Sequence, residues 1–248
     1  MAVFTKVSER EVGLFLQEYT LGKPLELAEI AEGVENSNYV ISTTEGRFIL
    51  TIFERRVSPA DLPFFLNLMQ HLSKRGICCP VPIKTKEGSV LQELCGKPAA
   101  VLSYLEGFSS HDPDIIDCLS VGATLADLHL AGSDFPERRR NNFSLGGWPS
   151  LLKSIGPNAD RLAEGMFLDI TEEIDYLTAA WPENLPCGII HGDLFPDNVL
   201  FHNKKLSGVL DFYFSCRDFL AYDLAVCLNS WSFDAEGVFD RQKSEGII

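Results

Sequence analysis

The sequence lacks an excess of basic residues, a long apolar run, and any internal repeat or low-complexity tract. Its 21 Lys and Arg stand against 35 Asp and Glu, which gives a formal net charge of −14. Such acidity argues against binding to nucleic acid or to an anionic membrane, because both require a basic surface. No apolar stretch approaches the roughly 18–20 residues that cross a bilayer. We therefore expect no nucleic-acid partner and no membrane partner.

The common cysteine motifs are also missing. The seven cysteines form no C-x-x-C pair, and no group of histidines and cysteines has the spacing of a zinc site. An odd number of irregularly spaced cysteines favours buried, reduced thiols in a cytoplasmic protein. Residues 1–11 carry several charges and no uninterrupted apolar core, so a secretory signal is not expected there.

Apolar residues make up 46% of the chain, enough for a sizeable core. The length of 248 residues fits one large domain or two lobes. Over residues 1–102 the pattern predicts a mostly antiparallel sheet crossed by one long helix. The expected elements are a helix over 8–19 capped by Ser8, hairpin strands at 38–43 and 47–53, a helix from Pro59 to Gly76, and strands at 89–94 and 98–104.

Helical periodicity prevails in the rest of the chain. Residues 103–107 are expected to form a hinge between an N-terminal nucleotide-binding lobe, 1–102, and a C-terminal catalytic lobe, 108–248. The expected elements of the second lobe are helices over 113–130, 158–180 and 220–231, a loop over 133–149, and a strand-loop-strand block over 189–214. The chain ends where another helix is expected to begin, which suggests an incomplete C-terminal lobe.

The chemically informative segment lies between His191 and Asp211. The spacing His191-x-Asp193-x-x-x-x-Asn198 matches the catalytic loop of kinases. A β-hairpin is predicted over 199–210. Because the ends of paired strands are adjacent, the open end of this hairpin should hold Asn198 close to Asp211.

These residue types suit phosphoryl transfer. A carboxylate at Asp193 can accept the proton of a hydroxyl nucleophile. Asn198 and Asp211 offer oxygen ligands, and Mg²⁺ uses few protein oxygens because it keeps waters and shares phosphate oxygens. The alternative, in which Asp193 and Asp211 only cap turns, is disfavoured by the joint pattern. Asp197, in contrast, is expected to be an exposed turn carboxylate.

The octamer 191–198, the pair Asp211-Phe212 and the segment 221–225 together resemble the aminoglycoside phosphotransferase/choline kinase family. Further segments resemble the homoserine kinases built on the same fold, namely 32–39, 61–66, 68–72 and 210–214. The resemblance extends from the N-terminus to about Phe233. It implies a two-lobed, protein-kinase-like α+β fold. The N-terminal lobe would be an antiparallel sheet with a helix, and the C-terminal lobe mainly helical with a catalytic β-hairpin.

The resemblance also implies ATP and Mg²⁺ as cofactors and L-homoserine as the small-molecule substrate, phosphorylated on its hydroxyl in threonine biosynthesis. Asp193 would be the catalytic base, and Asn198 and Asp211 would bind Mg²⁺. His191 would pack beneath the loop, and Asp223 would brace it through backbone N–H groups. The residues implied to bind ATP are Gly33, Asn36, Ser37 and Asn38 at the phosphates and the hinge residues Ser103, Tyr104 and Leu105 at adenine. No oligomeric state follows from these residues.

The chain departs from the protein-kinase pattern in two places. Thr51 stands at the strand position of the usual Lys, and the helix expected over 59–74 contains no Glu. Losing both partners together avoids an orphaned buried carboxylate. In addition, Tyr213 follows Asp211-Phe212 where protein kinases have Gly, which would stiffen that segment. Without the strand Lys, the ATP phosphates need another cation. The candidates are Arg55, Arg56 and Lys74.

Several alternatives stay open. The substrate could instead be an aminoglycoside, choline, hydroxylysine or methylthioribose. A nucleotide-binding pseudokinase is favoured by the missing strand Lys and disfavoured by the complete set of base and metal ligands. Asn36 and Asn38 fit an ordinary turn equally well. A zwitterionic substrate would need a cation, which Arg217 or the arginines at 138–140 could supply, although a solvated surface is the favoured interpretation of that run.

Overall fold

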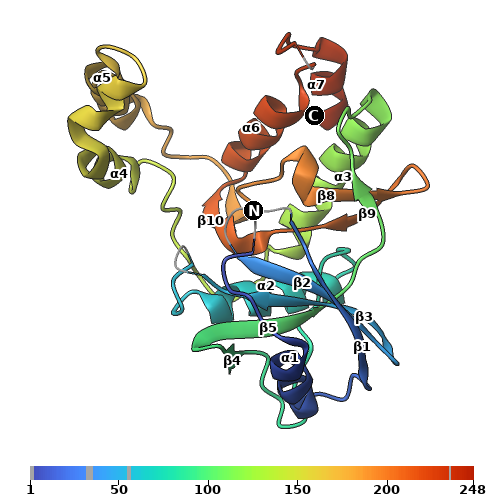
Figure 1. Cartoon of the computed structure of the whole chain (residues 1–248). Helices are drawn as coiled ribbons and strands as arrows, with labels where there is room; N and C mark the ends of the chain where they lie inside the picture. Colours follow the sequence, from blue (N-terminus) through green and yellow to red (C-terminus); the bar gives the residue numbers. More distant parts are fainter. Residues whose placement is uncertain (1–2, 32–35, 55–56, 235) are drawn as a thin grey trace.

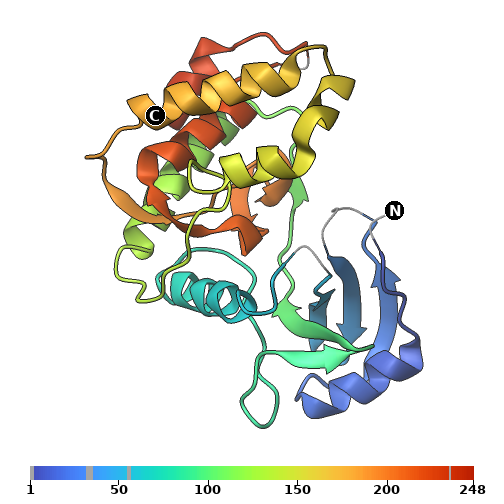
Figure 2. The same cartoon turned by 90° about the vertical axis from the view of Figure 1, so that its left-hand side faces the viewer.

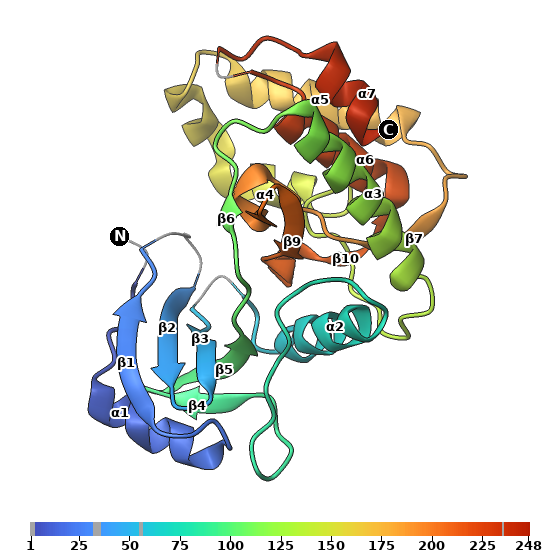
Figure 3. The same ribbon diagram turned by 90° about the vertical axis from the view of Figure 1, so that its right-hand side faces the viewer.

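The structure is a computed structural model that describes residues 3–31, 36–54, 57–234 and 236–248. Its N-terminal part forms a sheet-rich lobe and the rest forms a mainly helical lobe (Figure 1). Helix α2 (Leu62–Lys74) lies between the sheet and the helical lobe in both rotated views (Figure 2 and Figure 3). The expected two-lobed α+β arrangement is confirmed.

The N-terminal lobe is built on a five-stranded antiparallel sheet with the order β1-β2-β3-β5-β4. Its strands are β1 (Pro24–Glu29), β2 (Ser37–Thr43), β3 (Gly46–Ile52), β4 (Gln92–Leu94) and β5 (Lys97–Ser103). Both expected strand pairs are present. Strand β1 was not expected, because it is exposed over most of its length. Such a strand leaves little alternation of buried apolar residues for the sequence to show.

Helix α1 (Glu9–Phe15) covers one face of this sheet, and a 3₁₀ turn (Leu16–Glu18) continues it. The N–H of Glu11 donates to Ser8 Oγ and the N–H of Ser8 donates to the Glu11 carboxylate, which forms a capping box. The helix expected from Ser8 is therefore confirmed. The core under α1 consists of Val12, Phe15, Leu16, Tyr19, Leu21, Tyr39, Ile41, Leu50, Ile52, Leu94, Ala99 and Val101.

Helix α2 fastens the two lobes together. It begins at Leu62 rather than at Pro59, because a turn closed by the bond from Asp61 N–H to Ser58 O precedes it. Pro63 lies in the first turn instead, where the missing N–H has no intrahelical partner to lose. One continuous core includes Leu62, Phe65 and Leu66 of α2, Ala100 and Leu102 of β5, and Leu125, Val209 and Phe212 of the helical lobe.

The C-terminal lobe combines helices with two small antiparallel sheets, β6-β8-β9 and β10-β7. Its helices are α3 (Ile115–Ala131), α4 (Trp148–Ile155), α5 (Met166–Ala180), α6 (Leu220–Trp231) and α7 (Arg241–Ile247). Its strands are β6 (Phe108–Ser109), β7 (Cys187–Ile190), β8 (Val199–His202), β9 (Lys205–Val209) and β10 (Cys216–Phe219). None of the helices in the described part of the chain is long and apolar enough to cross a membrane.

The single helix expected over 158–180 is wrong. Helix α4 already begins at Trp148, a 3₁₀ turn covers 156–161, and α5 starts only after Gly165, whose φ of +81° ends the preceding turn. None of the residues of α5, all of which are described, is buried. Helices α4 and α5 accordingly project from the body of the lobe (Figure 1).

The cysteines are only partly as expected. All seven are free thiols; Cys79, Cys118, Cys216 and Cys227 are buried, whereas Cys78, Cys95 and Cys187 are exposed. The expectation of buried thiols is therefore wrong for the last three. Burial raises the pKa of Cys79 and of Cys216 to about 12, so both thiols stay protonated at neutral pH.

The inter-lobe core predicts a large effect of truncating α2. Leu66→Ala removes a fully buried side chain, and we expect it to lower the free energy of unfolding by about 2–5 kcal/mol. Lys74→Ala, at an exposed position of the same helix, is the control and should change it by less than about 0.5 kcal/mol. Urea denaturation measures both variants, and equal small effects would contradict a continuous core through α2.

Candidate active site

The loop that follows β7 carries the predicted catalytic base. It runs from His191 through Asp193 to a 3₁₀ turn (Pro196–Asn198) that enters β8. Gly192 has a φ of +80°, and a Cβ there would lie 3.2 Å from the carbonyl oxygen of Phe214. A larger residue would be strained at this point, so the loop can pass close to the segment after β9 only because Gly192 has no side chain.

Asp193 and Asn198 contact each other directly. Nδ2 of Asn198 donates to the backbone carbonyl of Asp193 at 2.8 Å and to its carboxylate Oδ2 at 3.0 Å. Because the amide nitrogen is committed to Asp193, the amide oxygen of Asn198 faces the other way as an acceptor. Both residues are half-buried. The arrangement orients a carboxylate and presents one further oxygen beside it.

Asp211 lies at the same end of the hairpin. The N–H of Leu210 donates to the carbonyl of Asn198 at 2.8 Å, so the residues before β8 and after β9 are adjacent. Asp211 has φ +56° and ψ 68°, a left-handed conformation that costs a non-glycine residue about 1–2 kcal/mol. Its carboxylate accepts a hydrogen bond from the N–H of Tyr213. The structure thus brings Asp193, Asn198 and Asp211 together.

His191 is the buried connection between the loop and the hairpin. The N–H of Asp193 donates to Nδ1 at 3.2 Å, so the proton must be on Nε2, which donates to the carbonyl of Leu210 at 2.8 Å. Burial lowers the pKa of His191, against a smaller opposing effect of Asp223. The imidazole is therefore neutral, and it fixes the distance between the base-bearing loop and Asp211 without adding a charge.

Asp223 of α6 holds the start of the loop. It accepts hydrogen bonds from the N–H groups of His191 and Gly192, both at 2.8 Å. His129 of α3 contacts the same carboxylate, with Nε2 2.9 Å from Oδ2. Asp223 is completely buried, so its charge is compensated by these contacts. The loop is thereby attached to two helices of the lobe.

The segment expected to cover the ATP phosphates is only partly described. Gly33 lies outside the described residues. Ser37 and Asn38 begin β2 rather than a turn. The side-chain oxygen of Asn36 accepts a bond from the N–H of Glu54 at 3.2 Å. Phosphate binding by this segment stays a prediction, and the side chains of Asn36 and Ser37 have partners within the lobe.

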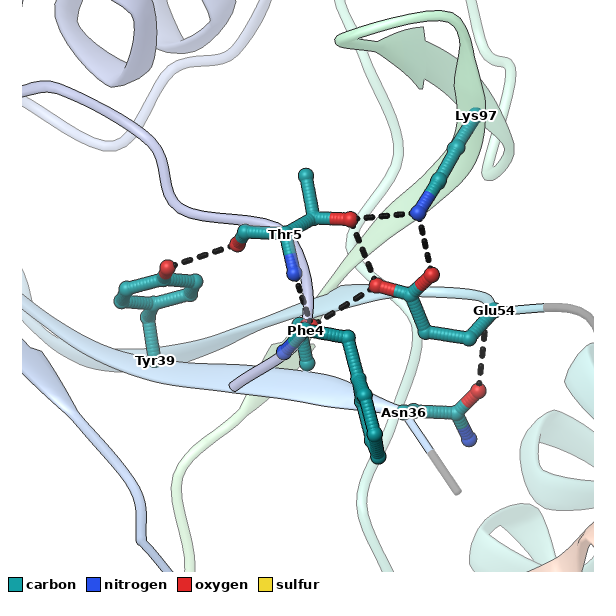
Figure 4. A network of polar contacts seen from close by, with 7 residues as sticks. Phe4, Thr5, Asn36, Tyr39, Glu54 and Lys97 are labelled. Atoms are coloured by element: carbon teal, nitrogen blue, oxygen red, sulfur yellow. Dashed lines mark hydrogen bonds and ion pairs between the residues drawn. The ribbon is translucent and has the colours of Figure 1, made fainter. Parts of the chain in front are cut away.

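Figure 4 shows a network of polar contacts around Glu54 at the end of the sheet. Ser37 takes part in this network. Its hydroxyl accepts bonds from the N–H groups of Phe4 and Thr5, both at 2.9 Å, and donates to Glu54 at 2.8 Å. The ammonium of Lys97 and the hydroxyl of Thr5 also donate to Glu54. Residues 4–5 are thus fixed to the start of β2 and the end of β3, beside the segment expected at the phosphates.

This network makes a prediction about pH. Burial alone would raise the pKa of Glu54, yet the bonds from Lys97, Thr5 and Ser37 outweigh it and lower that pKa. An acid with a lowered folded-state pKa stabilises the protein above its unfolded pKa, and the contribution disappears as the pH falls through the folded value. Glu54→Gln should therefore destabilise the protein at pH 7 and cost progressively less below about pH 4.5.

Urea denaturation of both proteins between pH 7 and pH 3 measures this difference. Glu87→Gln, at an exposed carboxylate of the same lobe, is the matched control. A difference between wild type and Glu54→Gln that stays constant over the whole range would show that the network does not depend on the charge of Glu54.

Each of the three predicted hinge residues contacts a different part of the protein. The N–H of Ser103 donates to the carbonyl of Val81, and the N–H of Val81 donates back to Ser103 Oγ, both at 2.9 Å. The guanidinium of Arg47 lies 4.2 Å from the ring centre of Tyr104. Leu105 packs directly over Gly208 of β9. The connector therefore touches the hairpin that joins Asn198 to Asp211, and its pairing with adenine stays a prediction.

Within the arginine run 138–140, Arg139 differs from its two neighbours, although nothing in the sequence sets it apart. Arg138 and Arg140 are exposed as expected, whereas Arg139 is half-buried and reaches the lobe interface. Its Nε donates to the carboxylate of Asp61 at 3.0 Å and its Nη1 to the carbonyl of Ser215 at 3.2 Å. The solvated interpretation is therefore wrong for Arg139. Of the candidate replacement cations, Lys74 is exposed and Arg55 and Arg56 lie outside the described residues.

The donor set suits one kind of metal. Within the described ranges, no group of three or more His, Cys, Asp and Glu side chains is arranged to hold an ion. An amide oxygen and a carboxylate, from Asn198 and Asp211, are hard oxygen ligands that fit Mg²⁺, which takes the rest of its coordination shell from water and phosphate. These two residues therefore fit a metal that arrives with a nucleotide.

A carboxylate on a loop, followed by a hairpin that carries an amide oxygen and a second carboxylate on a two-lobed fold, is the arrangement of a kinase-like phosphotransferase. Amicoumacin kinase hAmiN, solved with AMP-PNP and Ca²⁺, has this fold; it is 17% identical, with a TM-score of 0.69 over 90% of this chain and 69% of that one. The chain belongs to the phosphotransferase enzyme family, whose model matches residues 26–247.

Two curated relatives are much closer in sequence. The homoserine kinase of Methylorubrum populi is 50% identical over 248 residues, which are the whole of this chain and 77% of the relative. The homoserine kinase of Nitrobacter winogradskyi is 49% identical over the same length, with 76% of the relative covered. The chain thus spans about three quarters of each of these proteins.

Proposed function

We propose that the protein transfers the γ-phosphoryl group of ATP to the hydroxyl of L-homoserine, with O-phospho-L-homoserine and ADP as products. The juxtaposition of Asp193, Asn198 and Asp211 carries this proposal. The substrate is taken from the two homoserine kinases that are about half identical over the whole chain. We place the reaction in the cytoplasm, as a step of threonine biosynthesis.

Asp193 is the proposed general base. The hydroxyl of the substrate is a weak nucleophile, and a carboxylate that accepts its proton during attack on the γ-phosphorus accelerates the transfer. The hydrogen bond from Asn198 Nδ2 to Oδ2 orients the carboxylate, and the residue is half-buried. A half-buried position lets Asp193 meet a small hydroxyl compound beside the nucleotide.

Asn198 and Asp211 are the proposed Mg²⁺ ligands. The bound ion would supply positive charge to the phosphate oxygens on which negative charge develops. The chain's own contribution is orientation. The Asn198 amide is turned by its two bonds to Asp193, and Asp211 is placed by the strand pairing that ends at Leu210. These contacts therefore relate both proposed ligands to the loop that carries Asp193.

The remaining parts of the proposal concern ATP. Residues 1–102 would form the nucleotide-binding lobe, 103–107 the hinge and 108–248 the catalytic lobe. The backbone of Ser103, Tyr104 and Leu105 would pair with adenine, and the segment from Gly33 to Asn38 would cover the phosphates. The polar network around Glu54 supports this, because it fixes the start of β2 where that segment ends.

The general-base role gives a direct test. Asp193→Asn keeps the size of the side chain and removes its basicity, so we expect kcat with L-homoserine to fall by about 10²-fold or more. Asp197→Asn, at an exposed carboxylate of the same loop, should keep near-normal turnover. Release of ADP, measured with L-homoserine, L-serine, choline and kanamycin in parallel, reports both the rate and the substrate.

Two results would overturn parts of the proposal separately. Near-normal turnover of Asp193→Asn would remove this residue from the mechanism. A wild-type protein that consumes ATP with choline or kanamycin but not with L-homoserine would keep the phosphotransferase activity and replace the substrate.

A further inference from the structure

A cleft lies between the start of α2 and the loop that joins α3 to α4. Its volume of about 410 Å³ falls within the range of small-molecule sites. Asp61 lines it just before α2, and residues 137–140 line it from the loop. Because three arginines and two carboxylates face this space, the cleft can offer both signs of charge to a ligand.

Arg139 and Asp61 compensate each other inside the cleft. Nε of Arg139 donates to the carboxylate of Asp61 at 3.0 Å, and Nη1 donates to the carbonyl of Ser215 at 3.2 Å. The guanidinium also lies over the ring of Phe65, 4.9 Å from its centre. This pair fixes the loop against α2 and leaves ligand binding to the remaining charged groups.

Those remaining groups are Arg138, Arg140 and Glu137. In the part of the chain that the structure describes, none of the three forms an ion pair. Oε1 of Glu137 accepts a hydrogen bond from the neutral amide of Asn67 in α2 at 2.8 Å. That bond places the carboxylate without neutralising it. Two exposed cations and one oriented anion therefore face the same space.

This pattern of charge fits the head of an α-amino acid. Guanidinium groups bind carboxylates well, because their N–H donors match the two carboxylate oxygens. An ammonium group in turn donates to a carboxylate such as that of Glu137. A simple anion would meet the like charge of Glu137, and a simple cation would meet two arginines. The cleft therefore favours a zwitterion over either.

The cleft also lies beside the catalytic loop. Arg140 is bridged to Arg217 of β10, and the N–H of Arg217 donates to the carbonyl of Arg139 at 2.9 Å. Strand β10 pairs with β7, whose last residue, Ile190, directly precedes that loop. Two strand spacings amount to roughly 10 Å. An arginine side chain and a short hydroxy amino acid can together span this separation and reach Asp193.

We propose that the cleft binds the α-carboxylate and α-ammonium groups of the hydroxyl substrate, with Arg138 and Arg140 at the carboxylate and Glu137 at the ammonium. The inference rests on the proposed function, because the hydroxyl of the same molecule has to meet Asp193. It favours the arginine run over Arg217, which is not among the described side chains that line the cleft. Choline, which has no carboxylate, would gain nothing from the two arginines.

The double variant Arg138→Gln/Arg140→Gln tests this, because it removes both charges at exposed positions. We expect KM for L-homoserine to rise about 3- to 30-fold with little change in kcat, since binding is lost equally in the ground state and the transition state. Glu137→Gln should raise the same KM, and KM for ATP should not change. Arg10→Gln, at an exposed arginine of α1, is the matched control and should leave all these constants unchanged.

L-2-Aminobutyrate allows a second measurement without turnover, because it has the same amino-acid head and no hydroxyl. Calorimetry should show that it binds the wild type and that its Kd rises in the double variant by the same factor as KM. It should also compete with L-homoserine. An unchanged Kd in the double variant, an absence of binding to the wild type, or inhibition that is not competitive would overturn the inference. A wild type that binds L-2-aminobutyrate with the expected Kd shift, yet does not phosphorylate L-homoserine, would contradict the proposed function and keep the amino-acid site.

Discussion

Three of the hydrogen bonds of His191 are the constraint on which the site depends. One attaches the loop to Asp223, one accepts the N–H of Asp193, and one reaches the carbonyl of Leu210 directly before Asp211. Because the imidazole is completely buried and neutral, these bonds are made in a region of low polarity, where they are strong and costly to lose. The loop that carries Asp193 and the hairpin that ends at Asp211 are thereby one unit rather than two neighbouring ones.

The N-terminal lobe packs against this unit through helix α2 and the ring of Tyr213. The apolar core that passes from β5 through α2 into the helical lobe supplies most of the attachment. Arg139 adds hydrogen bonds to Asp61, just before α2, and to the carbonyl of Ser215. The ring of Tyr213, two residues after Asp211, contacts Phe53 just after β3 and Phe65 of α2, and so lies against both parts of the junction. Function and fold therefore share the same few residues.

The sequence was most informative where local spacing determines structure. The octamer from His191 to Asn198 and the hairpin after it were predictable, since strand pairing brings the two ends of a hairpin together. Strand β1 was not, because its exposed side chains follow no core pattern, and the break at Gly165 was hidden by apolar residues on both sides. Arg139 could not be told from its neighbours, because its partners, Asp61 and Ser215, are distant in sequence. Ser37 was assigned to a turn because its partners, Thr5 and Glu54, also lie outside its own segment of the chain.

The most direct test concerns the metal, with Mn²⁺ in place of Mg²⁺ and AMP-PNP as the nucleotide. The relaxation rate of water protons reports the bound ion without any turnover. Asn198→Ala and Asp211→Ala should each lose most of the protein-dependent enhancement, whereas Asp193→Asn should keep it, since the base is not a ligand. An enhancement in Asp211→Ala equal to that of the wild type would contradict the convergence of the three side chains on a metal-bound triphosphate.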